Sequence, residues 1–483
     1  MTAALFRPPM AQEINAISKR TITLTTPYEY VEENGSRFED ELCELLRIPS
    51  VSADRAHRDD VGKAADWMVA QFQRLGMDVQ RIETSGHPIV YAEWLKAPNA
   101  PTALIYGHYD VQPPDPLQAW ISPPFEPTRR DGNLYARGAT DDKGQMLTHV
   151  KSAEAWLKTE GRLPINLKFL IEGEEETGSE HLFQYIANNH EQLRAEVAVI
   201  SDTGQFAPGQ PAITYGLRGI CYYELNLRGP ARDLHSGSFG GAVVNPANTL
   251  ARMLTALIDE EGKIQVPGFY EDIEPISAEE RRRLASLPFD ERAFMKETGS
   301  TALGGETGFS TLERRWIRPS YDVNGVWGGY QGEGAKTVLP AEANAKFSFR
   351  LVPRQDPEKI TAALQAMLES LCPAGIQMKL SGSHGAPGVV VRQESPFMQA
   401  AADAIEKGFG RRPVLIREGG SIPVVSVFHE QLGLDTLLLG WGLEDDNTHA
   451  PNEKFCLADF HRGIRASTHL WEELRRVVAG EHG

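Results

Sequence analysis

The chain has 483 residues, of which 41% are hydrophobic and 24% are charged, and its formal net charge at pH 7 is −17. This length predicts two or three lobes rather than a single domain. The acidic balance argues against nucleic-acid binding, which needs a basic face, and against adsorption to anionic membranes. No stretch approaches the ~18 consecutive apolar residues of a membrane-spanning helix, so we expect no membrane partner.

The cysteines and the N-terminus contain no recognisable motif. Cys43, Cys221, Cys372 and Cys456 are far apart and form no Cys-x-x-Cys pair, so the sequence indicates neither a thiolate zinc site nor a redox motif. Residues 1–9 lack the basic start, the apolar core and the small-residue cleavage site of a signal peptide. We therefore expect a cytoplasmic protein with reduced thiols.

The first part of the chain alternates between helical and strand patterns. Residues 1–34 are expected to form an irregular extension. Apolar spacing predicts helices from about residue 36 and over 60–75, 144–158 and 180–190. Short apolar runs predict strands over 89–93, 103–106, 165–171 and 197–200. This mixture predicts an α/β layer with a mostly parallel sheet.

The pattern changes after Gly216. Residues 220–227 and 346–352 alternate like antiparallel strands, with a helix predicted over 245–259 between them. The α/β pattern resumes with a helix over 395–408, strands over 414–417 and 436–439, and a final helix over 457–478. We therefore predict an α/β domain in two parts, 1–216 and 392–483, with an α+β domain over 217–391 inserted between them.

Three consecutive glutamates, Glu174, Glu175 and Glu176, follow the predicted strand over 165–171. Like charges at the end of a buried strand repel one another and resist removal from water, so a positive group is needed nearby. Metal ions are one such group. A solvated acidic turn is the ordinary alternative for this run taken alone.

Other potential metal ligands also lie in loops or just beyond predicted strands, where open α/β sheets place their chemistry. A local hydrogen bond, a helix cap or a surface turn explains each one taken singly. Together they offer imidazole and carboxylate ligands without thiolates, a set that suits two divalent ions such as zinc or manganese bridged by one carboxylate. The residues are His108, Asp110, Asp141, Asp202 and His449.

The chain resembles the co-catalytic metallopeptidase family that includes aminoacylase, succinyl-diaminopimelate desuccinylase, glutamate carboxypeptidases and the carnosinases. It is most similar to the branch of the cytosolic non-specific dipeptidase and carnosinase. The resemblance runs from about residue 36 to the C-terminus. It rests on motifs that match in order: Gly-His-Tyr-Asp-Val-Gln-Pro, Arg-Gly-Ala-Thr-Asp-Asp-Lys-Gly, Glu-Glu-Glu-Thr-Gly-Ser, Asp-Leu-His-Ser-Gly and Arg-Glu-Gly-Gly-Ser-Ile-Pro.

The resemblance implies a three-layer catalytic domain with an inserted ferredoxin-like lid that builds a homodimer. It also implies two metal ions, zinc first, with manganese or cobalt as alternatives. Asp141 would bridge them, with a cis peptide to Asp142. One ion would bind His108 and Asp202, and the other would bind Glu176 and His449. Asp110 would orient the ring of His108, Glu175 would be the general base, and Glu174 would have a supporting role.

The resemblance also implies residues that contact the substrate. His235 would stabilise the oxyanion from a neighbouring subunit, and Arg350 would bind the terminal carboxylate of the substrate. Thr337, Gly420 and Ser421 match further contact positions. Without the resemblance, His235 and Arg350 would be taken for surface residues.

The expected activity is metal-dependent hydrolysis of dipeptides, or of short peptides with a free C-terminal carboxylate, by water that Glu175 deprotonates. An N-acyl amino-acid deacylase or carboxypeptidase of the same fold is the alternative. A non-catalytic metal-binding scaffold is an alternative of another class, and the presence of Glu175 argues against it.

Overall fold

The first helix of the structure corrects one expectation from the sequence. The computed structural model describes residues 25–382 and 385–479. Helix α1 (Pro27–Glu33) occupies a segment that we expected to be irregular, and residues 1–24 lie outside the described residues. Thr26 and Glu29 form a capping box and Pro27 occupies the first helical position, which explains why so short a helix begins here.

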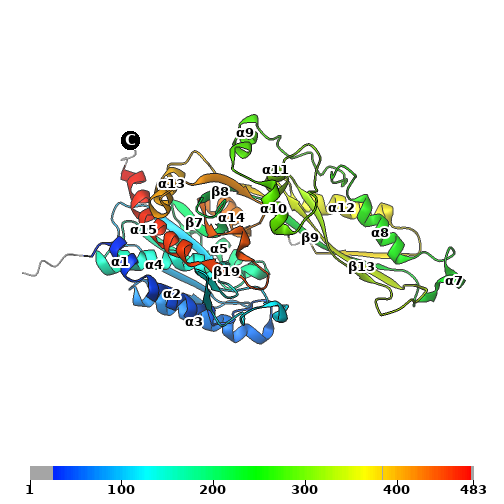
Figure 1. Ribbon diagram of the computed structural model, residues 1–483, viewed down its shortest axis with the longest axis horizontal. Coiled ribbons are helices and arrows are strands. Elements are labelled where there is room, and N and C mark those ends of the chain that lie inside the picture. The colour runs from blue at the N-terminus through cyan, green and yellow to red at the C-terminus, as the bar shows by residue number, and fades with distance from the viewer. Residues whose placement is uncertain (1–24, 383–384, 480–483) are drawn as a thin grey trace, which may run out of the picture.

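A nine-stranded mixed sheet forms the centre of the larger unit (Figure 1). Parallel pairing is confined to its central strands and to one branch, whereas the flanking strands are antiparallel, so the expectation of a mostly parallel sheet was wrong. The short connection between β1 and β2 explains one antiparallel pair, because it cannot hold a crossover. The strand order is β1 (Asp78–Ile82), β2 (Ile89–Trp94), β6 (Asn166–Glu172), β3 (Thr102–His108), β7 (Val197–Gly204), β18 (Asp435–Gly442), β8 (Ala212–Leu217) and β16 (Val389–Val390), with β17 (Val414–Glu418) beside β8.

Helices cover both faces of this sheet, which confirms the three-layer expectation. Gly107 of β3 faces Met146 of α4, whereas its neighbour Tyr106 packs edge-on against Phe428, which follows α14. Adjacent strand residues point to opposite faces, so α4 and α14 lie on opposite sides. The helices of this unit are α2 (Gly35–Leu46), α3 (Arg58–Arg74), α4 (Lys143–Thr159), α5 (Glu180–Asn188), α6 (His190–Leu193), α13 (Pro396–Phe409), α14 (Pro423–Val427) and α15 (Leu457–Ala479).

A separate antiparallel sheet forms the second unit, which extends away from the first in Figure 1. Its core includes Tyr223, Phe347, Phe349 and Leu364, and the strict alternation of burial along β9 explains why the sequence signal was clear. The order is β11 (Ser320–Gly328), β13 (Glu342–Leu351), β9 (Gly219–Arg228) and β14 (Gln377–Ser381), with β15 (Gly385–Ala386) also on β9 and helices α8 (Pro246–Ala256) and α12 (Pro357–Leu371) packed on it.

Residues 278–317 connect the two units. They contain α9 (Ala278–Ser286), α10 (Glu291–Thr298) and α11 (Thr311–Trp316), and Leu312 and Trp316 pack with Ile416 of β17. This contact brings a segment of the inserted sequence to the edge of the large sheet. In the part of the chain that the structure describes, no helix has the length and apolar character needed to cross a bilayer.

Candidate active site

The predicted metal ligands converge at one edge of the large sheet. His108 ends β3, Asp202 lies near the end of β7, and Glu176 lies in a 3₁₀ turn (Glu175–Thr177) directly after β6. These three strands are parallel neighbours, so their carboxyl ends meet. Asp141 precedes α4 and His449 lies in the loop after β18, which brings two distant parts of the chain to the same point.

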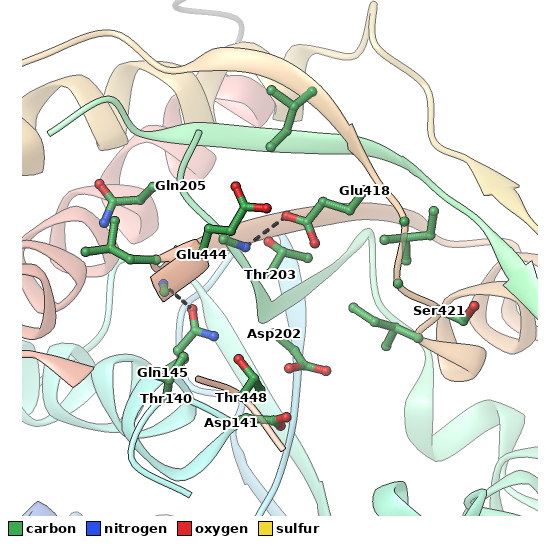
Figure 2. Close-up of a pocket in the computed structure, with 18 of the residues that line it drawn as sticks. Thr140, Asp141, Gln145, Asp202, Thr203, Gln205, Glu418, Ser421, Glu444 and Thr448 are labelled. Atoms are coloured by element: carbon green, nitrogen blue, oxygen red, sulfur yellow. Dashed lines mark hydrogen bonds between the residues drawn. The ribbon is translucent and has the colours of Figure 1, made fainter. Parts of the chain in front are cut away.

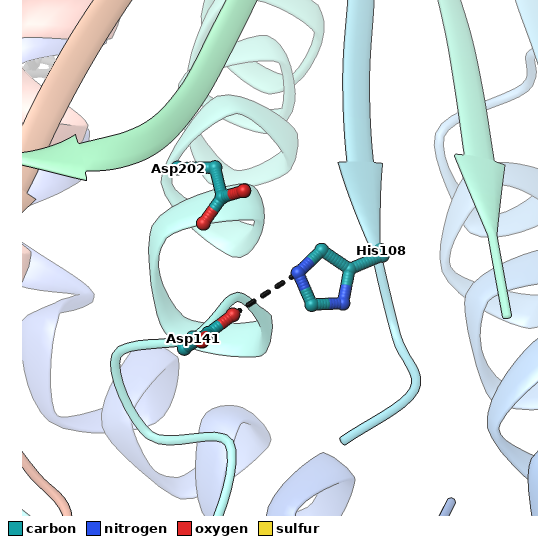
Figure 3. Close-up of side chains that lie close together, drawn as sticks. All are labelled: His108, Asp141 and Asp202. Atoms are coloured by element: carbon teal, nitrogen blue, oxygen red, sulfur yellow. Dashed lines mark ion pairs between the residues drawn. The ribbon is translucent and has the colours of Figure 1, made fainter. Parts of the chain in front are cut away.

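The ligands form two groups that share Asp141. His108, Asp141 and Asp202 make one group (Figure 3), and Asp141, Glu176 and His449 make the other; within each group the ligand atoms lie within 4.8 Å of one another. Nε2 of His108 is 3.1 Å from Oδ1 of Asp141, and Nε2 of His449 is 2.9 Å from Oδ2. Each oxygen of Asp141 therefore faces a different group, as a bridging carboxylate requires. The Asp141–Asp142 peptide is cis, as the resemblance implied.

Asp110 holds both a ligand and the candidate base. Its carboxylate oxygens accept hydrogen bonds from the backbone N–H groups of Glu175 and Glu176, each at 3.2 Å. Its Oδ1 also lies 3.4 Å from Nδ1 of His108, and the backbone carbonyl oxygen of Asp110 lies 3.1 Å from the same nitrogen. A carboxylate behind a ligating imidazole fixes the orientation of the ring and leaves Nε2 to face the metal. Asp110 therefore contacts the candidate ligand His108 and also anchors the glutamate turn.

The three glutamates point to different surroundings. Oε1 of Glu174 accepts a hydrogen bond from the backbone of His87 at 2.9 Å, and its Oε2 lies 2.7 Å from Nδ1 of His181, outside both metal-binding groups. Glu175 lines the cavity with Asp141 and Asp202. Only Glu176 joins a metal-binding group.

The crowded carboxylates of this site shift the pKa values of its ionisable groups, as expected for a site that binds cations. Burial, reinforced by neighbouring carboxylates, raises the pKa of both Glu175 and Asp202 well above the usual range. Hydrogen bonds to Asp141 and Glu176 raise the pKa of His449 to about 11. Burial alone would lower the pKa of His108, but the adjacent carboxylates of Asp110 and Asp141 outweigh this effect and raise the pKa well above its usual range. Bound cations would relieve the crowding of these carboxylates.

The donor set fits divalent metal ions. Nε2 of His108 is fully buried and lacks a well-aligned hydrogen bond among the described residues, as expected for an atom that faces a metal. The two groups offer imidazole nitrogens and carboxylate oxygens only, which suits zinc and also manganese or cobalt.

A cavity of about 520 Å³ opens beside the metal-binding groups (Figure 2). Its lining includes the predicted residues Gly420 and Ser421 as well as Asp141, Glu175 and Asp202. A hydrogen bond of 3.2 Å joins Arg350 of β13 to the hydroxyl of Ser421, so the structure brings these two predicted substrate residues together.

His235 and Thr337 lie elsewhere. His235 lies in β10 (Leu234–His235), which pairs with β12 (Val338–Leu339), and Thr337 directly precedes β12. Both residues lie next to α7 (Ser236–Phe239) at the far end of the second unit (Figure 1). The backbone N–H of Ser236 donates to the carbonyl of Thr337 at 3.1 Å, so the two predicted residues are neighbours. Both are exposed, and neither lines the cavity of its own chain.

Comparison with known proteins identifies the family. The sequence model of peptidase family M20/M25/M40 matches residues 104–473. The chain belongs to this family. The predicted resemblance is therefore confirmed, and the protein is a metal-dependent peptidase.

Three relatives of this peptidase match over nearly their whole length. The chain is 32% identical to Cys-Gly metallodipeptidase dug1 of Schizosaccharomyces pombe, over 94% of this chain and 99% of the relative. Its structure matches that of human carnosine dipeptidase 1 with a TM-score of 0.82 and 30% identity, covering 93% and 98% of the two chains. It also matches the metallo-carboxypeptidase Sso-CP2 of Sulfolobus solfataricus with a TM-score of 0.82 and 32% identity, covering 91% and 99%.

The structure of the peptidase adds supporting residues that the sequence did not single out. Nε2 of Gln112 donates to Oε2 of Glu176 at 2.7 Å. Glu453 is almost fully buried and accepts hydrogen bonds from the backbone N–H groups of Thr140 at 3.1 Å and Asp141 at 3.2 Å. Both residues lie within five positions of a metal ligand, a signal that could have drawn attention to them.

Arg218 is a third residue that the sequence left unnoticed. It lines the cavity of the peptidase beside Gly420 and Ser421. Its guanidinium donates only to backbone carbonyls and to the hydroxyl of Ser320, and within the described residues no carboxylate pairs with it. Burial lowers the pKa of Arg218 to about 10, so it stays charged at neutral pH.

Proposed function

We propose that this metallodipeptidase hydrolyses dipeptides, or short peptides with a free C-terminal carboxylate, at a two-metal centre. One observation carries the proposal: Glu175 lines the cavity beside the shared ligand Asp141 without belonging to either metal-binding group. A protein that only holds metal does not need an additional carboxylate there, so this position supports a catalytic base.

The metal centre would hold two divalent ions, of which zinc suits the ligands best. His108 and Asp202 would bind one ion, Glu176 and His449 the other, and Asp141 would bind both. Such ions, when bound, activate water and polarise the scissile carbonyl. The charge of two divalent ions also matches the four carboxylates of Asp141, Glu175, Glu176 and Asp202.

Glu175 would take a proton from the attacking water and deliver it to the departing amine. Asp110 fixes the backbone N–H of Glu175 at 3.2 Å, which keeps the base in place between the two transfers. The raised pKa of Glu175 favours proton uptake, and the cations of the site would balance this effect.

The carboxylate end of the substrate would bind beside Ser421. Arg350 already donates to its hydroxyl, and Gly420 leaves the backbone accessible at the cavity wall. Arg218 offers a second guanidinium in the same region that lacks an acidic partner among the described residues. Guanidinium groups suit the planar geometry of a carboxylate.

A homodimer would complete the site. Edge strand β11 carries the exposed apolar side chains of Val323, Val326 and Trp327, which are 44%, 60% and 37% exposed. An exposed apolar edge strand is suited to cover by another chain. His235 and Thr337 lie far from the cavity of their own chain, so they would act in that of the partner.

A dipeptide panel tests the proposal. Protein stripped of metal should lose hydrolysis, and zinc, manganese or cobalt should restore it to different extents. Side-by-side rates on dipeptides, N-acetylated amino acids and longer peptides separate a dipeptidase from a deacylase or carboxypeptidase. If no substrate is cleaved with any metal, and Glu175→Gln behaves as the wild type does, the catalytic proposal is wrong.

The location of the protein is proposed to be the cytoplasm. All four cysteines are unpaired, and Cys43 and Cys221 are buried. Unpaired thiols are typical of a reducing compartment. Fractionation of cells that express the tagged full chain would test this assignment.

A further inference from the structure

One carboxylate of the cavity has no evident task. Five acidic residues line it, of which Asp141 and Asp202 are candidate metal ligands and Glu175 is the candidate base. Glu444 forms an ion pair with Arg315 of α11. Glu418 remains, and in the described part of the chain no cationic side chain lies within ion-pairing distance of it.

The surroundings of Glu418 hold one of its oxygens and leave the other free. Oε1 accepts hydrogen bonds from the backbone N–H of Gly204 at 2.9 Å and from the hydroxyl of Thr214 at 3.1 Å. Oε2 accepts none from the residues that the structure describes. Figure 2 shows the carboxylate beside Thr203, one residue from the metal ligand Asp202. Burial raises the pKa of Glu418 to about 6, so the group is still mostly ionised at pH 7.

Groups near Glu418 fit the two ends of a dipeptide. Leu217 pairs with Glu418 across strands β8 and β17, and Arg218 follows directly. The two side chains diverge, because Glu418 turns to Gly204 whereas Arg218 donates to the carbonyl of Gly419. The cavity thus carries a carboxylate at the end of β17 and a guanidinium directly after β8, and neither forms an ion pair with any of the described residues. A fully extended dipeptide spans only about 7 Å, so its charged ends need opposite charges close together.

We infer that Oε2 of Glu418 binds the free ammonium group of the N-terminal residue of the substrate. The inference rests on the proposed dipeptidase function and deepens it, because it names the residue that separates dipeptides from N-acyl amino acids. Phe206, Trp316 and Ile416 line the same cavity and give the side chain of that residue an apolar wall. The carboxylate of Glu418 is partly buried and has no ion-pair partner among the described residues, so the ammonium group of the substrate would supply the missing charge.

A purely structural role for Glu418 is the competing explanation, and Glu418→Gln separates the two. The amide oxygen of glutamine can still accept from Gly204 and Thr214, so the structural contacts persist. Its NH₂ group replaces Oε2 and cannot accept a hydrogen bond from an ammonium group. Only a role in amine recognition therefore predicts a loss that depends on the amine of the substrate.

The experiment compares alanyl-glycine with propionyl-glycine, which differ only by the amino group. The metal-loaded wild type should prefer alanyl-glycine. Glu418→Gln should lower kcat/KM for alanyl-glycine by about 10- to 150-fold, the usual effect of one hydrogen bond to a charged group, and leave that for propionyl-glycine within about twofold. Glu444→Gln is the matched control, since its carboxylate already pairs with Arg315 and its loss should leave the ratio of the two substrates unchanged.

The outcomes distinguish this inference from the proposed function. Cleavage of neither substrate by the wild type would contradict the proposed function itself. Equal cleavage of both by the wild type, or an equal loss for both in Glu418→Gln, would overturn the inference and leave peptidase activity standing. Equal cleavage by the wild type would overturn the inference even if the variant does not fold, and circular dichroism with metal analysis identifies that case. Glu418→Asp then supplies the second test, because it keeps the carboxylate and should keep a preference for alanyl-glycine.

Discussion

Glu453 should control how tightly the metal centre binds its ions, although it is not a ligand. Its carboxylate accepts from the backbone N–H groups of Gly138, Thr140 and Asp141 at 2.9, 3.1 and 3.2 Å, and it pairs with Arg137 at 2.8 Å. Glu453 therefore fixes the loop that holds Asp141, the candidate ligand shared by the two groups. In Glu453→Gln one oxygen becomes an NH₂ group that faces N–H donors, so part of this support is lost.

Two effects of different size follow. Arg137 and Glu453 are both buried, with side chains 1% exposed, so removal of the negative charge leaves an uncompensated guanidinium and should lower the free energy of unfolding by about 3–5 kcal/mol. Loss of support behind Asp141 should weaken metal binding by about 10- to 100-fold, as for other residues that orient ligands. The second effect is specific to the site, whereas the first is not.

Urea unfolding in the presence of chelator measures the first effect, and competition with a chromophoric chelator well below the unfolding transition measures the second. Glu473→Gln is a matched control. Glu473 of α15 is also buried and pairs with Arg476 at 2.7 Å and with Lys407, but it contacts no metal ligand. Glu473→Gln should lose less stability than Glu453→Gln, because the partners of Glu473 are partly exposed, and it should keep wild-type metal affinity. Folded Glu453→Gln with wild-type metal affinity would refute the reasoning.

Further changes test other parts of the structure. Glu175→Gln should lower kcat by at least about 10²-fold with metal content unchanged, whereas Glu176→Gln should lower metal content, as elemental analysis would show. Burial lowers the pKa of His149 in the folded state to about 3, whereas in the unfolded state it is ~6.5. Between these values only the unfolded state binds a proton, so stability falls as the pH drops. At pH 5 the loss is about 2 kcal/mol relative to pH 7, and urea unfolding of His149→Gln should show that this part of the pH dependence is absent. Trp327→Lys on β11 should convert a dimer to monomers in light-scattering measurements, and an unchanged mass would place the interface elsewhere. A mixture of His235→Ala and Glu175→Gln subunits should recover about a quarter of wild-type activity if His235 acts across a two-fold dimer, and none if it does not.

The candidate metal ligands follow local patterns, so the sequence could single them out. His108, Glu176 and Asp202 each come at or just past the end of an apolar strand, and parallel strands bring such ends together without any knowledge of tertiary contacts. The alternating burial of β9 made the second unit visible in the same way. Roles within the site came from the resemblance, since spacing alone does not separate a base from a ligand.

The residues that the sequence missed depend on contacts between distant segments. Glu453 meets Asp141 across 312 positions, and Arg218 donates to Gly419 across 201. Apart from the nearness of Glu453 to His449 in the sequence, nothing local distinguishes these two residues from other charged residues in loops. Strand β1 was missed for a different reason: its burial pattern contains no fully buried residue, so it lacks the apolar run that marks a strand.

The glutamate run shows where local physics ends and tertiary structure begins. The turn over Glu175–Thr177 is a 3₁₀ helix with three residues per turn, so consecutive side chains point about 120° apart and cannot all face one ion. That much follows from the sequence once the turn is recognised. Which glutamate faces the metals depends on Asp110, whose two oxygens hold the N–H groups of Glu175 and Glu176 and thereby set the rotation of the turn. Because the same carboxylate lies 3.4 Å from His108, one residue couples the position of the base to that of a ligand.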